Sequence, residues 1–260
     1  MRLIQVPPGL LVSSGLLVAL TVAVNLGGPV ALVDHAGAVL TVEHSSWRKV
    51  RVAQIVSSVG DPHHLIPLTF VAALGVAVLR RSGLRGALIV ATVGIACAIS
   101  LIMKDLLPSP RPDIGFTNVL HAYPSTHTTA TATLFGAIAV TAFARRKVQD
   151  LALVLAALGG LAVGLARVVV QAHWPSDIVG GLLLGGVAVF ALRWFCDTTG
   201  RPISPADPRT GTRSRSAPRR PLPVAAGRPD GSSRRWSWVT RRTRPDAPSG
   251  TGQGGRGHTP

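Results

Sequence analysis

Three ionisable residues stand between two long apolar segments of this sequence. They are Arg167, His173 and Asp177, with five residues between the first two and three between the last two. Ionisable side chains are costly within a membrane, so their presence there indicates a functional site. A histidine can attack phosphorus through an unprotonated ring nitrogen if a carboxylate holds the other nitrogen and fixes the tautomer. The spacing therefore predicts His173 as a nucleophile that Asp177 orients.

Two further polar islands precede this one, and the first of them is rich in charge. Residues 104–112 contain Lys104 and Arg111, which together with Arg167 supply three cations. Three fixed cations suit a substrate with two or more negative charges, and the planar fork of arginine matches phosphate oxygens. They would also stabilise the charge on the equatorial oxygens during phosphoryl transfer. A phosphoryl site is predicted.

The other polar island, residues 124–127, directly precedes an apolar segment. A helix that begins here presents free backbone N–H groups and the positive end of its dipole to an anion. Ser125 can cap this helix or donate to a phosphate oxygen. His127, which has no obvious nearby carboxylate, is predicted to protonate the leaving group as a general acid. Pro175 and Asp177 suit the first turn of another helix, and none of these roles requires a metal or a cofactor.

The connections between the islands predict that all three meet on one face of a membrane. Lys104 and His127 are joined by a segment that contains several prolines and Gly115, which is poorly suited to crossing a bilayer. Two apolar segments, each near the crossing length of about 20 residues, separate His127 from His173. The chain therefore leaves that face and returns to it.

The composition favours a membrane protein over a soluble one. Of the 260 residues, 47% are hydrophobic and only 15% are charged, which is unusual for a soluble globular domain. The net charge of +16 comes mainly from the C-terminal part, so it does not indicate a nucleic-acid-binding fold. Cys97 and Cys196 lie in or beside apolar runs and form no disulfide framework.

Six apolar segments predict an all-α fold, a polytopic membrane helix bundle with about six transmembrane helices in residues 1–200, followed by a tail in 201–260. The segments are residues 9–33, 65–79, 87–103, 125–144, 151–170 and 175–195. The first is interpreted as a retained helix, with a signal peptide as the alternative. Residues 34–64 are predicted to form an extramembrane connection with an interfacial helix near 50–56.

Basic clusters predict the orientation of these segments. With six crossings, residues 80–85, residues 145–147 and the region from Arg193 onward share one side with Arg2. The positive-inside rule makes that side cytoplasmic. The prediction is a multi-pass plasma membrane protein with both termini in the cytoplasm and the polar islands on the extracytoplasmic face.

The tail, residues 201–260, contains thirteen arginines and three aspartates and almost no aliphatic run. Such a segment cannot bury enough apolar surface to offset its ordering entropy, so disorder is predicted. Its arginines, with Trp236 and Trp238 among them, suit the anionic lipids of the inner leaflet. A solvated tail without a partner is the alternative.

The polar islands resemble the signature of the type 2 phosphatidic acid phosphatase superfamily, which contains lipid phosphatases and vanadium haloperoxidases. The three matching motifs are Lys104, six residues and Arg111-Pro112; Pro124-Ser125-Thr126-His127; and Arg167, five residues, His173, three residues and Asp177. The resemblance covers roughly residues 34–195. It implies a helical membrane enzyme of this superfamily.

The resemblance also implies roles for individual residues. His173 would form a phosphohistidine, Asp177 would orient it and His127 would be the acid. The phosphate binders would be Lys104, Arg111, Ser125, Thr126 and Arg167. The activity expected is a metal-independent hydrolysis of a lipid phosphate or polyprenyl diphosphate at the extracytoplasmic face, with the phosphorylated lipid and the bilayer as partners.

Two positions depart from the pattern of the superfamily. Thr126 stands where glycine is usual, and Ala166 stands where serine usually precedes the arginine. A β-branched residue restricts the backbone where glycine would let an N–H approach phosphate closely, although the threonine hydroxyl offers a substitute donor. The departures bear on the rate and the substrate preference more than on the chemistry, because every ionisable residue of the motifs is present.

Other interpretations of the same residues are a helix cap and buried pair for His173 with Asp177, and interfacial snorkelling for Lys104 and Arg111. A zinc site at His127, His173 and Asp177 fits by ligand type, but neighbouring cations would repel a metal ion. The alternative function is a non-catalytic protein that binds anionic lipid or serves a transporter. A haloperoxidase-like use is a third hypothesis.

Overall fold

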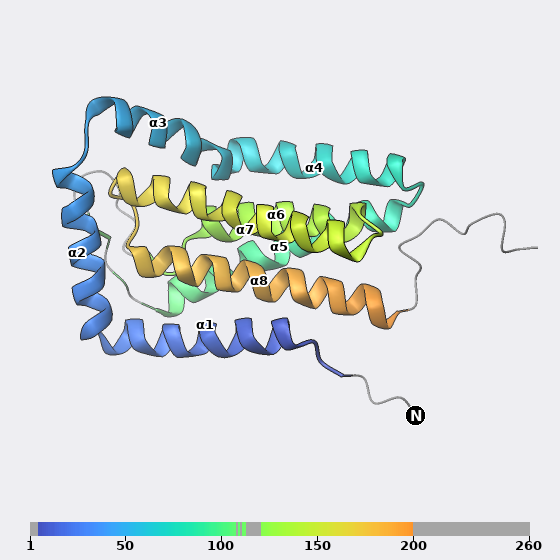
Figure 1. The fold of residues 1–260 in the computed structure, drawn as a ribbon, viewed down its shortest axis with the longest axis horizontal. Coiled ribbons are helices and arrows are strands. Elements are labelled where there is room, and N and C mark those ends of the chain that lie inside the picture. Colours follow the sequence, from blue (N-terminus) through green and yellow to red (C-terminus); the bar gives the residue numbers. More distant parts are fainter. Residues whose placement is uncertain (1–4, 108, 110, 113–120, 200–260) are drawn as a thin grey trace, which may run out of the picture. The chain divides into compact units, whose positions relative to one another are not determined.

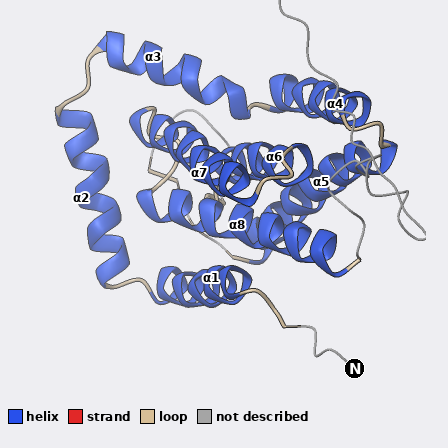
Figure 2. Ribbon diagram, turned by 45° about the vertical axis from the view of Figure 1, so that its right-hand side comes forward, coloured by secondary structure: helices blue, strands red, loops and turns tan. Residues whose placement is uncertain are grey.

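The structure is a computed structural model of the chain, and it describes residues 5–107, 109, 111–112 and 121–199. These residues form helices and connecting loops and contain no strand (Figure 2). The predicted all-α class is confirmed. The helices are α1 (Pro8–Leu26), α2 (Pro29–Glu43), α3 (Trp47–Ser57), the 3-10 turn η1 (Ser58–Gly60), α4 (Pro62–Leu79), α5 (Gly83–Leu106), α6 (Thr126–Ala142), α7 (Arg146–Val169) and α8 (Pro175–Thr198). The predicted tail, residues 201–260, lies outside the described residues.

Five of these helices are long and apolar enough to cross a membrane, namely α1, α4, α5, α7 and α8. The remaining predicted segment, residues 125–144, forms the shorter α6 of 17 residues. Most side chains of α6 are buried, because α5, α7 and α8 all pack against it. The fold is therefore a membrane helix bundle arranged around α6, as Figure 1 shows.

The prediction of one helix over residues 9–33 is wrong. α1 ends at Leu26, and both Gly27 and Gly28 adopt positive φ angles of 70° and 67°. Glycine adopts this conformation at little cost, and Pro29 then begins a new helix. The chain turns sharply, and α2 runs across the ends of the bundle (Figure 1). The helix predicted near residues 50–56 lies within α3.

The basic clusters meet at the end of the bundle where α4 joins α5 and α6 joins α7. Arg80, after α4, donates a hydrogen bond to the carbonyl of Ala142 at the end of α6. Arg146, at the start of α7, pairs with Asp197 near the end of α8. The three polar islands lie at the other ends of the same helices, so the bundle separates the basic clusters from the islands.

Small residues let α6, α7 and α8 approach one another closely. A Cβ atom added at Gly136 would lie 2.4 Å from a methyl group of Val189, and one at Gly164 would lie 2.3 Å from a methyl group of Ile178. Side chains at these positions would force the helices apart. Such contacts are typical of membrane helices, where packing drives association. They set the spacing of the helices that carry His127, Arg167 and Asp177.

Candidate active site

His173 lies in the short turn between α7 and α8, and Asp177 holds its ring. The Nδ1 atom of His173 lies 3.0 Å from Oδ2 of Asp177, and the two side chains are 1% and 0% exposed. The same Oδ2 accepts a hydrogen bond of 2.9 Å from the backbone N–H of Trp174. Pro175 occupies the first turn of α8 as predicted. Because a carboxylate only accepts, Nδ1 donates and Nε2 is left unprotonated.

Burial and neighbouring charge keep the His173 ring neutral. Burial lowers the pKa of His173 well below its usual 6.5, and the positive charges of Lys104, Arg111 and Arg167 lower it further, as does His127. A neutral imidazole is the form that can attack an electrophile. The site therefore presents the reactive form of His173 at neutral pH.

Ser125 connects the starts of α6 and α8. Its backbone N–H donates a hydrogen bond of 3.0 Å to the carbonyl of Asp177. Ser125 is the N-cap residue of α6, but of its two predicted roles the side-chain cap is not formed, because the side chain makes no capping hydrogen bond. Its hydroxyl oxygen instead accepts a hydrogen bond of 3.1 Å from the hydroxyl of Thr128. The Ser125 hydroxyl keeps its own hydrogen to donate.

The three predicted cations differ in their partners. Lys104, which is buried at the end of α5, donates from Nζ to the carbonyl of Ala122 at 2.8 Å. The Nε atoms of Arg111 and Arg167 are buried and have no hydrogen-bond partner among the described residues. A buried donor without an acceptor costs about 1–3 kcal/mol. An anion between the two guanidinium groups would satisfy them.

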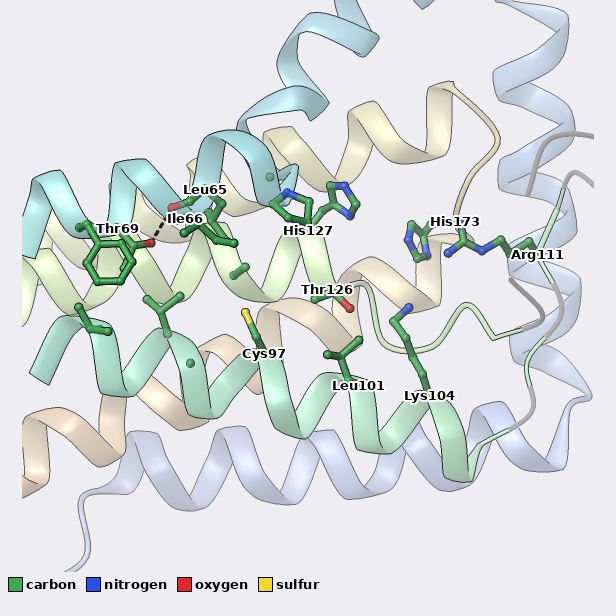
Figure 3. Close-up of a pocket in the computed structure, with 17 residues that line it drawn as sticks. Leu65, Ile66, Thr69, Cys97, Leu101, Lys104, Arg111, Thr126, His127 and His173 are labelled. Carbon is green, nitrogen blue, oxygen red and sulfur yellow. Dashed lines mark hydrogen bonds between the residues drawn. The ribbon is translucent and has the colours of Figure 1, made fainter. Parts of the chain in front are cut away.

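The polar residues form one end of a cavity of about 530 Å³ between α4, α5 and α6 (Figure 3). Lys104, Arg111, Thr126, His127 and His173 line this end. The remaining walls are mainly apolar and include Leu65, Ile66, Phe70, Val90, Val93, Cys97 and Leu101. The cavity combines a cationic end with a long hydrocarbon-lined region, which is the shape of a site for an amphipathic anion.

A second cavity, of about 740 Å³, lies between α3 and the end of α7. Arg111 lines both cavities, and the second also has Gln54, Ser57, Asp61 and Arg167 in its wall. Its lining is thus richer in hydrogen-bonding groups. Arg111 therefore lies between the cationic end of the first cavity and this more polar one.

His127 has a carboxylate partner that the sequence did not indicate. Its Nε2 atom lies 2.8 Å from Oδ1 of Asp61, which stands between η1 and α4. The expectation that His127 lacks a carboxylate is therefore wrong. Sixty-six residues separate the two, and an aspartate before Pro62 is typical of an ordinary helix cap.

A second missed carboxylate, Asp34, holds the start of α8. Its two oxygens accept from the backbone N–H of Ser176 at 2.8 Å and from the Ser176 hydroxyl at 2.6 Å. Asp34 is buried on α2, and a Cβ atom at the nearby Gly37 would lie 2.8 Å from Pro175. α2 therefore packs against the turn that carries His173.

The two positions that depart from the expected motifs have different surroundings. The Thr126 hydroxyl lies 2.9 Å from the hydroxyl of Ser100 on α5, while the residue also lines the first cavity. Ala166 is buried and lines a hollow between α3 and α7. The part of Thr126 in phosphate binding stays a prediction. Among the described residues, no three His, Cys, Asp or Glu side chains are grouped so that they could hold a metal ion.

Comparison with known proteins finds a family that part of the chain resembles. Residues 85–201 match the model of the PAP2 superfamily. That stretch is similar to the PAP2 superfamily. It contains α5 from Arg85 onward, α6, α7, α8 and every residue of the three motifs, so the predicted resemblance is confirmed.

Relatives of the PAP2 stretch are named as lipid phosphatases. The chain is 30% identical over 113 residues to a lipid A 1-phosphatase of Rhizobium etli, covering 39% of this chain and 46% of that protein. It is 31% identical over 126 residues to the putative undecaprenyl-diphosphatase YbjG of Escherichia coli, covering 44% and 61%. The chain thus spans roughly half of the length of these two relatives. A third, phosphatidylglycerophosphatase B of Bacillus subtilis, is 24% identical over 148 residues.

A solved structure supports the fold over a larger part of the chain. The crystal structure of a transmembrane PAP2 type phosphatidylglycerolphosphate phosphatase from Bacillus subtilis superposes with a TM-score of 0.67 and 21% identity. The match covers 74% of this chain and 98% of that one. The match extends over more of the chain than residues 85–201 and supports the helical membrane fold.

Proposed function

We propose that this PAP2 protein is a membrane phosphatase that hydrolyses a lipid phosphate or a polyprenyl diphosphate through a phosphohistidine. One observation carries the proposal. The neutral His173, held by Asp177, lies at the cationic end of a cavity whose other walls are apolar. A phosphate group fits the cations and a hydrocarbon chain fits the walls.

In the first step, Nε2 of His173 attacks phosphorus while the bond from phosphorus to the leaving oxygen breaks. His127 gives that oxygen a proton. Lys104, Arg111 and Arg167 stabilise the charge on the remaining phosphate oxygens. The products of this step are the lipid with one phosphate group fewer and a phosphohistidine, and Asp177 stabilises the positive charge on the modified ring.

In the second step, water attacks the phosphohistidine and the bond between phosphorus and nitrogen breaks. His127, now unprotonated, takes a proton from the water. Inorganic phosphate leaves, and both histidines return to their first state. The second cavity, which reaches Arg111 and Arg167, offers a path for water and phosphate that the lipid chain does not occupy.

The names of the relatives support a phosphorylated lipid as the substrate class. Lipid A 1-phosphate, undecaprenyl diphosphate and phosphatidylglycerophosphate each join a phosphate to a long hydrocarbon anchor. The apolar cavity between α4 and α5 provides the corresponding groove here. Mono- and diphosphates therefore both belong in the substrate panel.

The orientation that we propose follows from the two ends of the bundle. The basic clusters at one end favour the cytoplasmic side, which puts the active site on the extracytoplasmic face of the plasma membrane and both termini in the cytoplasm. The tail, residues 201–260, would then face the anionic inner leaflet.

The test is phosphate release by the purified protein from micelles of phosphatidic acid, phosphatidylglycerophosphate and undecaprenyl diphosphate. We expect release from at least one lipid, its loss in His173→Ala, and full activity in EDTA. Acid quenching of the wild type should trap an acid-labile phosphohistidine. Lipid binding without any release would instead support the non-catalytic alternative, and full activity in His173→Ala would contradict the mechanism.

A further inference from the structure

Asp61 occupies the N-cap position of α4, but its side chain makes no capping hydrogen bond. An aspartate at this position ordinarily accepts from a backbone N–H of its own helix, which stabilises a helix by about 1 kcal/mol. Here the carboxylate instead reaches 2.8 Å across to Nε2 of His127 on α6. The Asp61 carboxylate therefore binds His127 and caps no backbone N–H of α4.

The backbone around Asp61 is fixed against His127. The Asp61 N–H donates to the carbonyl of Ser58 at 3.0 Å, and its carbonyl accepts from the N–H of Leu65 at 2.8 Å. A Cβ atom at Gly60 would lie 2.9 Å from Cβ of His127 and 3.2 Å from its Cα. η1 therefore packs directly on the base of the histidine, and this contact requires glycine.

The charges around His127 make a carboxylate partner necessary for an acid role. Burial and the positive charges of Arg167 and Lys104 disfavour a proton on this ring, and Asp61 supplies the opposing hydrogen bond and negative charge. Without Asp61, the His127 ring would bind less readily the proton that a general acid must donate. In the bond to Asp61, Nε2 donates to the carboxylate, so Nδ1 is the nitrogen available to a substrate.

We propose that Asp61 is the positioning residue of the general acid, so that the site contains two histidine–carboxylate pairs with separate tasks. The inference rests on the proposed phosphatase function. As His173 bonds to phosphorus, the leaving oxygen keeps the electron pair of the broken bond and takes the proton from Nδ1 of His127. Asp61 keeps its charge throughout and holds Nε2–H. In the hydrolysis step, Nδ1 takes a proton back from water.

A double-mutant cycle on the lipid that the wild type cleaves fastest tests this pairing. General acid catalysis contributes about 10²–10⁴ in rate, and we expect Asp61→Asn to lower kcat/KM for that lipid by about 10². If Asp61 acts only through His127, then Asp61→Asn has no further effect in a His127→Ala background. Asp61→Glu, which keeps the carboxylate, should recover part of the activity. Asp150→Asn, at an exposed ion pair with Arg193, is the matched control.

The leaving group provides a readout that a purely structural role would not move. Nitrophenolate leaves without a proton, whereas the alkoxide released from a lipid monophosphate needs one, so this readout uses phosphatidic acid or phosphatidylglycerophosphate as the lipid. We therefore expect Asp61→Asn to lower hydrolysis of p-nitrophenyl phosphate at least tenfold less than hydrolysis of the lipid. Equal losses on both substrates, or a full additional loss in His127→Ala, would overturn the inference while leaving the phosphatase function intact. A wild type that releases no phosphate from any substrate would overturn the proposed function itself.

Discussion

Replacing Asp177 by asparagine tests how the nucleophile is oriented. Oδ2 of Asp177 accepts from Nδ1 of His173 at 3.0 Å and from the backbone N–H of Trp174 at 2.9 Å. If the amide oxygen of asparagine takes this position, both bonds remain and only the negative charge is lost. The fold should survive this change, because the shape of the side chain and its two contacts are kept.

The size of the effect follows from the charge on the hydrogen bond. Hydrogen bonds to charged groups contribute about 1.5–3 kcal/mol, and about 1.4 kcal/mol corresponds to a tenfold change in rate. If this contribution is felt mainly as positive charge develops on His173, then kcat/KM should fall by about 10- to 150-fold. The variant Asp177→Ala, which also loses both contacts, should fall further.

The assay is phosphate release from the best lipid of the panel, with acid-quench trapping of the phosphohistidine. We expect less trapped intermediate in Asp177→Asn, because the step that forms it is slowed. Asp197→Asn is the control on the same helix, since Asp197 pairs with Arg146 at the opposite end of the bundle. Activity of Asp177→Asn within threefold of the wild type would refute the orienting role.

Three further predictions follow from the same geometry. Because neighbouring cations help to lower the pKa of His173, Lys104→Gln should raise that pKa and move the acidic limb of the kcat/KM profile to higher pH; an unmoved limb would contradict this. Gly94 lines the first cavity and has open space around it, so a side chain there should hinder long lipids. Gly94→Leu should therefore raise KM for a long-chain lipid and leave p-nitrophenyl phosphate hydrolysis unchanged. Gly75→Leu on α4 is the control. Thr126→Val removes the hydrogen bond with Ser100 and should lower the free energy of unfolding by about 1 kcal/mol. Thermal denaturation measures this change. A Tm equal to that of the wild type would show that the hydrogen bond does not stabilise the fold.

Much of the fold could be predicted, because membrane helices are recognisable in a sequence as long apolar runs. The segments at 65–79, 87–103 and 175–195 lie within helices of the structure, and the segment at 151–170 extends one residue beyond the end of α7. The first predicted segment, residues 9–33, is too long for α1, because the sequence is apolar on both sides of Gly27 and Gly28. Hydropathy alone does not distinguish a straight helix from two helices that meet at a sharp turn.

The three motifs and the pair of His173 with Asp177 could be predicted from the sequence alone, because a residue just before a helix lies close to the first turn of that helix. The partners of His127 and of the first turn of α8, in contrast, come from distant parts of the chain that meet only in the folded protein. Asp61 meets His127 across 66 residues, and Asp34 meets Ser176 across 142. Such contacts depend on how η1 and α2 pack against the bundle. A short sequence pattern does not reveal that packing. The local sequence around an aspartate before a helix is the same whether its side chain caps that helix or binds a residue of another helix.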